Sequence, residues 1–135
     1  MTSLPLAIRV APDAHTTSAV RVALAGRLDS DTAPELERAL QPLVGGDTTS
    51  VVMELAELTF LSSAGIRVLV AARKGLRARG GTLVLSRAQP QVATVLGIVM
   101  ALPDLMLFED DRELDRHLAE VQAKTLDARR HKSGA

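Results

Sequence analysis

The sequence predicts an α/β domain in which an N-terminal β-hairpin leads into a mixed β-sheet with about four helices packed against it. Three observations favour this class. Apolar residues first recur at every second position over two short segments. Strand-like apolar runs then alternate with amphipathic segments, and glycine, proline or short polar side chains stand at the boundaries. Strands that alternate with helices after a hairpin indicate a layered structure that contains parallel strands.

The hairpin is expected at the start of the chain. Apolar and other residues alternate over residues 6–10 and again over residues 20–24, which is typical of half-buried strands. The polar segment 13–18 between them has the composition of a turn. Gly26 is predicted to end the second strand.

The first helix is expected to follow directly. Thr32 and Glu35 have the spacing of a capping box, and Pro34 falls in the first turn. Leucines at positions 36, 40 and 43 then give a helical stripe. Gly45 and the glycine after it are predicted to stop this helix.

The middle of the chain predicts a strand, a long helix and a second strand. Residues 51–55 are apolar almost throughout, as expected of a central strand that is covered on both faces, and a short loop is expected after them. A helix should open near Ser63, present an apolar stripe from Ile66 to Leu76, and end at Gly80. Residues 82–86 read as a further strand.

The last part of the chain predicts a helix that opens at Pro90, a short strand over residues 105–108 and a polar helix over 111–121. We expect residues 1–122 to form one folded domain. Residues 123–135 are charged and have no apolar stripe, so they are predicted to be a flexible tail.

Composition excludes several classes of function. The chain has 135 residues, and 47% of them are hydrophobic, which fits a single globular domain. Sixteen basic and sixteen acidic residues cancel, and only two aromatic residues are present, so neither nucleic acid nor a membrane is an expected partner. No cysteine, signal peptide or long apolar run is found. We expect a cytoplasmic protein with no cofactor or metal that acts through a surface.

The most informative segment is the pair Ser62-Ser63 between the central strand and the long helix. Backbone N–H groups and the helix dipole favour negative charge at this position. Ordinary helix capping explains the two hydroxyls without any function. A site at which a phosphate is accepted explains them as well.

Catalytic interpretations find little support. The histidines, at positions 15, 117 and 131, are far from the serine pair in sequence, and no Gly-x-Ser-x-Gly elbow is present. A small serine hydrolase that pairs Ser63 with His117 is therefore only a remote alternative. The acidic trio at 109–111 precedes a predicted helix and is better explained by capping than by a metal site. We expect no enzymatic activity.

The run Met-Glu-Leu-Ala-Glu-Leu-Thr-Phe-Leu-Ser-Ser-Ala-Gly-Ile at residues 53–66 resembles the signature of STAS domains, and more narrowly that of bacterial anti-sigma factor antagonists. The family pattern closes a strand with an acidic residue and leucine, and it opens a helix with Asp-Ser-Ser-Gly. Residues 26–29, Gly-Arg-Leu-Asp, match the Gly-x-Leu-Asp that follows the second strand of the family. The resemblance extends over residues 4–121.

This resemblance implies a module for partner switching that responds to stress by regulating transcription. In the family, the unphosphorylated antagonist binds an anti-sigma factor that is a serine kinase and thereby releases the sigma factor. Phosphorylation abolishes that binding, and a PP2C-type phosphatase restores it. By position in the motif, Ser63 is the phosphorylated residue. Ser62 occupies the acidic position and is the alternative acceptor, and Ala64 replaces the second serine of the motif.

The same resemblance, with helical spacing, suggests a partner surface around Ser63. Arg67 is four residues on and can neutralise a phosphate. With Lys74 and Arg77 it forms a basic stripe in which Val70 is the apolar residue, and a solvated helix face explains this stripe equally well. Asp29 lies in a turn where capping is an alternative explanation. The residues expected to contact the partner are Asp29, Ser62, Ser63, Ala64, Gly65, Arg67, Val70 and Lys74. A STAS regulator of a target other than a sigma factor, such as a phosphatase or a secretion component, remains the alternative function.

Overall fold

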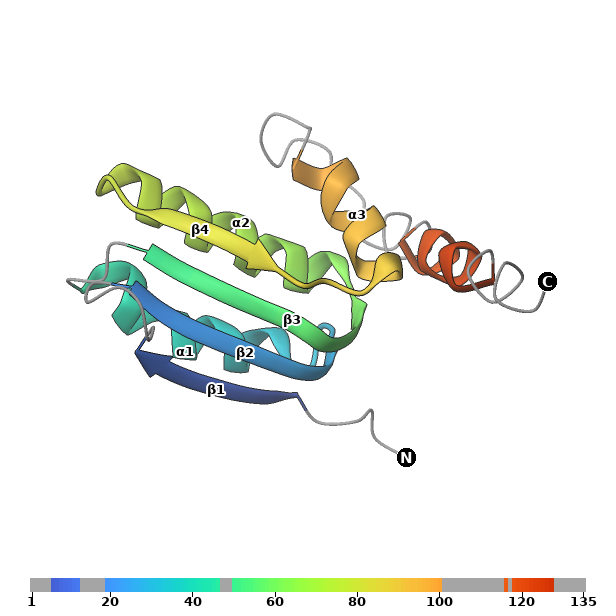
Figure 1. Cartoon of the computed structure of the whole chain (residues 1–135), viewed down its shortest axis with the longest axis horizontal. Helices are drawn as coiled ribbons and strands as arrows, with labels where there is room; N and C mark the ends of the chain where they lie inside the picture. The colour runs from blue at the N-terminus through green and yellow to red at the C-terminus, as the bar shows by residue number, and fades with distance from the viewer. Residues whose placement is uncertain (1–5, 13–18, 47–49, 101–115, 117, 128–135) are drawn as a thin grey trace.

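The computed structural model describes residues 6–12, 19–46, 50–100, 116 and 118–127. Four strands form one mixed sheet in the order β1-β2-β3-β4 (Figure 1). These strands are β1 (Ala7–Pro12), β2 (Ala19–Leu28), β3 (Ser50–Leu61) and β4 (Thr82–Ser86). β1 pairs antiparallel with β2, whereas β2, β3 and β4 run parallel. The predicted fold class, a hairpin that leads into a mixed α/β sheet, is confirmed.

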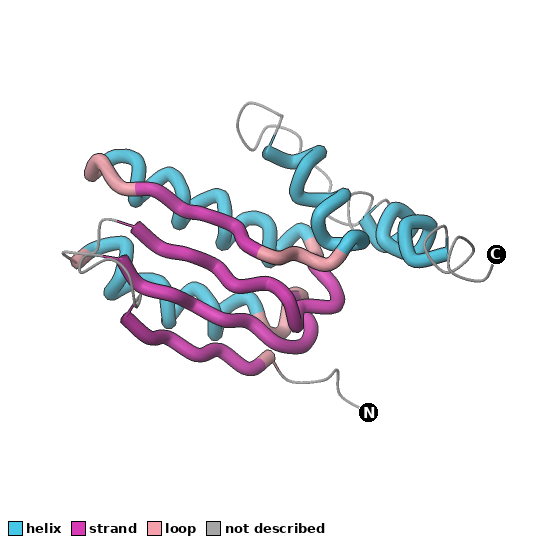
Figure 2. Tube along the Cα trace, in the orientation of Figure 1, coloured by secondary structure: helices cyan, strands magenta, loops and turns pink. Residues whose placement is uncertain are grey.

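Three helices and one further helical stretch accompany the sheet. They are α1 (Ala33–Gly45), α2 (Ser63–Ala78) and α3 (Pro90–Met100), followed by helical residues at 116 and 118–127, here named the final helical stretch. α1 and α2 lie on the same face of the sheet (Figures 1 and 2). This follows from the strand order, because two successive right-handed crossovers in one direction place both helices on one side.

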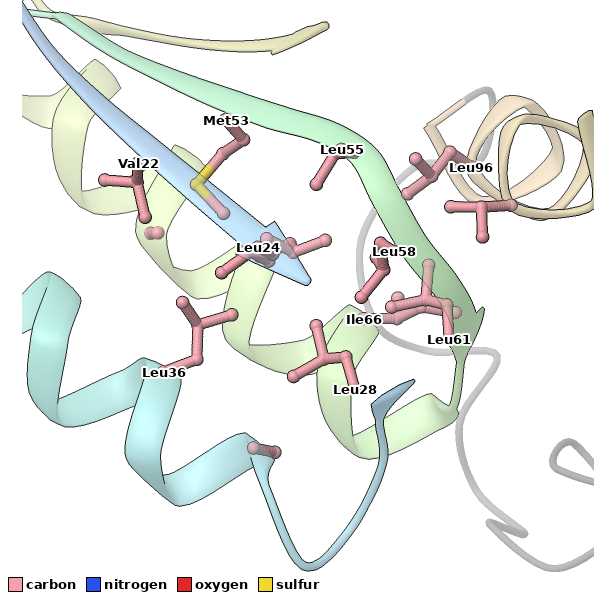
Figure 3. Close-up of a cluster of buried hydrophobic side chains, with 14 of the residues drawn as sticks. Val22, Leu24, Leu28, Leu36, Met53, Leu55, Leu58, Leu61, Ile66 and Leu96 are labelled. Atoms are coloured by element: carbon pink, nitrogen blue, oxygen red, sulfur yellow. The ribbon is translucent and has the colours of Figure 1, made fainter. Parts of the chain in front are cut away.

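The core lies between the sheet and these two helices, and it extends to α3 through Val92, Val95 and Leu96 and to Leu118. Leucine and valine are its commonest residues (Figure 3). The predicted stripe of α2 is confirmed, because Ile66, Leu69, Ala72 and Leu76 are all buried. The prediction that residues 51–55 are covered on both faces is wrong. Val51, Met53 and Leu55 are buried toward the helices, whereas the alternate residues are only half-buried, since α1 and α2 pack on the same side.

The two parallel strands that lead to the serine pair are longer than predicted. β2 passes through Gly26, which has φ of +112°, and β3 continues through Leu61 without the expected loop. The register between them shifts twice, and at each shift β3 holds one residue more than β2. The Thr59 hydroxyl donates to the Gly26 carbonyl at 3.0 Å beside the second shift. These β-bulges break the period-two pattern, so the segment resembles a loop in sequence.

The start of α1 also differs from the prediction. Thr32 precedes the helix, but its side chain makes no capping hydrogen bond, so the predicted capping box is wrong. The Thr32 hydroxyl instead donates to the Arg27 carbonyl at 2.8 Å and accepts from the Asp29 N–H at 2.9 Å. It turns back into the loop because these two backbone groups need partners there. The end of α1 at Gly45 agrees with the prediction.

Several predictions from the sequence concern the part of the chain after α3. The strand expected at 105–108, the acidic trio at 109–111, the start of the helix expected at 111 and residues 128–135 lie outside the described residues. The final helical stretch continues to residue 127, past its predicted end at Val121. Within this stretch the Thr125 hydroxyl donates to the Val121 carbonyl at 2.8 Å. The domain boundary after residue 122 stays a prediction.

Candidate functional site: the β3–α2 junction

The serine pair lies where β3 ends and α2 begins, at the carboxyl edge of the parallel strands (Figure 1). The Ser62 N–H donates to the Leu28 carbonyl at 2.9 Å, so the end of β2 holds the junction in place. Ser62 has an extended backbone and is the N-cap of α2, and its Oγ accepts from the Gly65 N–H at 3.4 Å. The capping interpretation therefore holds for Ser62. Ser63 is the first residue of the helix.

Both serines are buried. The exposed fraction is 6% for Ser62 and 3% for Ser63. Each serine therefore offers little surface to solvent or to another protein while the first turn of α2 stays closed. Any chemistry at Ser63 therefore requires a local opening of the junction.

Gly65 completes the junction because the core leaves no room for a side chain there. A Cβ at this position would lie 2.5 Å from Cγ of Leu28 and 3.1 Å from Cδ1 of Leu61. Both leucines are fully buried at the carboxyl ends of their strands (Figure 3). The glycine of the motif thus lets the first turn of α2 approach β2 and β3.

The loop that carries Asp29 lies beside Ser62, because Asp29 directly follows Leu28 and the Leu28 carbonyl accepts from the Ser62 N–H. Asp29 Oδ1 accepts from the N–H groups of Asp31 at 3.0 Å and Thr32 at 3.1 Å. Its other oxygen, Oδ2, lies 3.9 Å from Nε of Arg27. The structure thus supports the turn-forming interpretation of Asp29, and it also places this carboxylate at the edge that holds the serines.

Sequence reasoning did not identify one neighbouring pair, Arg27 and Phe60. The two residues are paired in register on β2 and β3, one position before the buried leucines. The Arg27 guanidinium lies 4.1 Å from the centre of the Phe60 ring, a cation–π contact. One feature of the sequence could have indicated Phe60: it is one of only two aromatic residues, and it stands within the motif.

The residues predicted to contact the partner lie in two places, at the β3–α2 junction and further along α2. Asp29 and residues 62–65 gather at the junction. Lys74 lies further along α2, roughly 16 Å from Ser63 by the rise of a helix, and is exposed. Arg67 is half-buried, and Val70 packs partly against the core, as Ala64 also does. The apolar residue of the basic stripe therefore contributes to the core as well as to the surface.

Glutamine side chains complete the edge of β3 beyond the end of β4. β4 pairs with residues 50–54 of β3. Further along, Gln89 Nε2 donates to the Ala56 carbonyl at 2.7 Å and Gln91 Nε2 to the Thr59 carbonyl at 3.2 Å. At the last residue of the strand, the amide of Gln122 binds Leu61. These side-chain amides satisfy backbone groups with which no strand in the described part of the chain pairs.

The serine hydrolase alternative depends on residues outside the described part of the structure. The three histidines lie outside the described residues, and so does the pairing of Ser63 with His117 that a hydrolase would require. Over the described residues, no group of three acidic, histidine or cysteine side chains is placed to hold a metal ion. No described helix is both long and apolar enough to span a membrane.

A mixed four-stranded sheet with α1 and α2 on one face, and a serine pair where β3 meets α2, define a STAS-type α/β domain. The family model described as "Mlab, STAS domain" matches residues 12–102. The chain therefore belongs to the STAS domain family.

Three curated relatives are each named as an anti-sigma factor antagonist. The putative anti-sigma factor antagonist BtrV of Bordetella bronchiseptica is 39% identical over 75 residues, which are 56% of this chain and 65% of the relative. The anti-sigma-B factor antagonist of Listeria monocytogenes is 33% identical over 69 residues, 51% of this chain and 60% of the relative. The chain thus spans less than two thirds of the length of these two relatives. The anti-sigma-B factor antagonist of Staphylococcus epidermidis is 29% identical over 94 residues, 70% of this chain and 86% of the relative.

Solved structures share the fold. The unphosphorylated form of the anti-sigma factor antagonist SpoIIAA superposes with a TM-score of 0.58 at 20% identity, over 68% of this chain and 83% of that chain. An anti-sigma factor antagonist from Mycobacterium paratuberculosis has a TM-score of 0.58 at 24% identity, over 85% of this chain and 99% of that chain. At these identities the likeness concerns the fold alone.

Proposed function

We propose that this chain is an anti-sigma factor antagonist that is regulated by phosphorylation at Ser63. The unphosphorylated form binds an anti-sigma factor with serine kinase activity, and this binding releases the sigma factor. Phosphorylation of Ser63 switches the binding off, and a PP2C-type phosphatase restores it. The chain acts by binding rather than by catalysis, and it acts in the cytoplasm. The observation that carries this proposal is the position of Ser63 as the first residue of α2, directly after the capping residue of a STAS domain.

The physical effect of a phosphate at this position supports the switch. Phosphorylation adds a charge of about −1.5 to −2. The first turn of α2 contains no acidic residue, and its backbone N–H groups and dipole favour an anion. The start of the helix therefore favours the charge of the modified residue, although its phosphate needs the first turn of α2 to open because Ser63 is buried. A partner packed against the junction then meets a dianion that it must desolvate.

The alternative acceptor, Ser62, has a structural role of its own. Its Oγ accepts from the Gly65 N–H and so caps the helix. The position in the family motif also assigns the phosphate to Ser63.

The surface proposed to contact the kinase is the junction with its flanking loop. Asp29 and residues 62–65 supply the centre, because β2 holds the loop and the serines side by side. Arg67, Val70 and Lys74 extend the surface along α2. Charge at the junction would decide the affinity, since a charge inside an interface must be paired or leave water at a cost.

Phosphorylation by the anti-sigma factor kinases of the source genome tests the assignment. The protein is incubated with each kinase and ATP, and the phosphate is counted by intact-mass spectrometry and located by fragmentation. We expect one phosphate on the native chain and none on Ser63→Ala. Ser62→Asp is the matched control, because aspartate keeps a side-chain cap while it removes the Ser62 hydroxyl. It should still gain one phosphate. A phosphate on another residue, or none with any kinase, contradicts the proposal.

A second candidate is a STAS regulator that switches a partner other than an anti-sigma factor. One observation favours it: the description of the family model that matches this chain names no sigma factor. Recovery of bound proteins from native lysate on the immobilised Ser63→Ala variant separates the two candidates. An anti-sigma factor kinase among them supports the first, and its consistent absence supports the second.

A further inference from the structure

The amide of Gln122, on the final helical stretch, holds the last residue of β3. Gln122 Oε1 accepts from the Leu61 N–H at 3.0 Å, and Gln122 Nε2 donates to the Leu61 carbonyl at 2.9 Å. Nε2 also donates to the Leu118 carbonyl at 3.0 Å, which fixes the amide to its own helix. Gln122 is 3% exposed, so these hydrogen bonds form out of reach of water. A single side chain thus replaces a neighbouring strand at Leu61.

This contact holds the segment that leads into the serine pair from one side, and β2 holds it from the other. On the β2 side, the Ser62 N–H donates to the Leu28 carbonyl. On the other side, the pairing with β4 ends at Glu54, and Gln122 binds both backbone groups of Leu61. Leu61 is one residue from the capping serine and two from Ser63. The position of the serines therefore depends on both contacts.

The two contacts differ in how easily they can open. Release on the β2 side would break pairing inside the sheet, next to the fully buried Leu28. The final helical stretch is attached more lightly: Leu118 and Gln122 are its buried members, and most of its other described residues are exposed. Elements with few buried contacts open at the lowest free energy. The local opening that exposes Ser63 therefore begins with release of this stretch.

We propose that the final helical stretch acts as a clasp on the β3–α2 junction and that Gln122 is the positioning residue which closes it. While the amide of Gln122 holds Leu61, Ser63 stays buried. When the clasp opens, Ser63 becomes accessible to a modifying enzyme. The consequence for phosphorylation rests on the function proposed above. The control of access at position 63 does not.

A thiol at position 63 measures access without any kinase. The chain contains no cysteine, so Ser63→Cys introduces a single reactive group whose rate of modification by an aromatic disulfide reports its exposure. We compare this rate in the native background, in Gln122→Met and in Thr125→Val. Methionine keeps the length and helix propensity of glutamine but makes no hydrogen bond to Leu61.

The clasp predicts that Gln122→Met raises the rate at Ser63→Cys by about tenfold, since it leaves two buried backbone groups without partners. Thr125→Val changes the same helical stretch but removes only a bond within that stretch, and the rate should stay unchanged. Equal rates in all three backgrounds would overturn the proposal. If Gln122→Met fails to fold, Gln122→Glu replaces it, because its carboxylate can accept from Leu61 N–H but cannot donate to the carbonyl.

A second thiol separates local opening from global unfolding. Met53→Cys places the reporter in the centre of β3, where the native residue is fully buried. The clasp predicts that Gln122→Met accelerates modification at position 63 and leaves position 53 slow. Equal acceleration at both positions means that the whole domain has opened, and it overturns the proposal.

The kinase adds a separate comparison. The initial rate of Ser63 phosphorylation should be higher in Gln122→Met than in the native chain, and Thr125→Val should match the native rate. Faster thiol modification with an unchanged phosphorylation rate overturns the regulatory role of the clasp. If no kinase modifies the native chain or the variants, the proposed function fails, and the two thiol measurements still decide whether the clasp controls access.

Discussion

Ser62 and Ser63 are adjacent in sequence but have different structural roles. Ser62 has the extended backbone of an N-cap and binds the Gly65 N–H, whereas Ser63 begins the helix. This division explains how a serine can stand where the family motif carries an acidic residue. Serine and aspartate are both strong N-cap residues, because either side chain offers an oxygen to the first turn. The substitution at position 62 therefore keeps the cap on which the position of Ser63 depends.

A pair of substitutions tests the role of Ser62. Ser62→Ala should lower the free energy of unfolding by about 1 kcal/mol, since the Gly65 N–H loses its acceptor in a buried position. Ser62→Asp should stay within about 0.5 kcal/mol of the native value, because the acceptor is retained. Urea titration followed by circular dichroism measures both. An alanine variant as stable as the native chain would contradict the capping role.

The elements that could be predicted from sequence are those with a local periodic pattern. The stripe from Ile66 to Leu76 identified α2, and the end of α1 followed from consecutive glycines. The bulges of β3 could not be predicted, because they depend on pairing with β2 rather than on neighbouring residues. The hydroxyl of Thr59, for example, binds the carbonyl of Gly26, which is 33 positions away.

The candidate site was predictable to a similar extent. The motif identified the serines. The match of residues 26–29 to the family pattern indicated that Asp29 belongs to the same surface. The contact of Gln122 with Leu61 joins residues 61 positions apart, and no pattern around Gln122 distinguishes it from a glutamine on a solvated helix. The burial of Ser63 was also not evident, since a residue at a helix start has no fixed exposure.

The packing of α2 on the parallel strands gives a prediction for Gly65. Gly65→Ala should destabilise the domain by about 1–3 kcal/mol, because the added methyl group overlaps the side chain of Leu28. This cost exceeds the gain of up to about 1 kcal/mol that alanine brings to a helix. Gly97→Ala in α3 is the control. Open space surrounds that position, so the substitution should be neutral or stabilising, and similar effects at both glycines would refute the packing argument.

At the scale of the whole molecule, most of the core and the serine pair occupy different places. Most of the core lies between the sheet and the two helices on one face, whereas the serine pair lies at the carboxyl edge where β3 turns into α2. On the opposite face, Glu54 joins β2 to the segment after β4 through Arg21 at 2.5 Å and Arg87 at 3.4 Å.

The affinity of the chain for the anti-sigma factor kinase that we propose as its partner tests the central claim most directly. Isothermal titration calorimetry compares the native chain with Ser63→Asp and with Ser63→Asn, which has the same shape as aspartate but no charge. If a negative charge at position 63 switches off binding, Ser63→Asp weakens the affinity by about 30-fold or more relative to Ser63→Asn, since an unpaired charge in an interface costs about 2 kcal/mol or more. Equal affinities for the two variants would contradict the account.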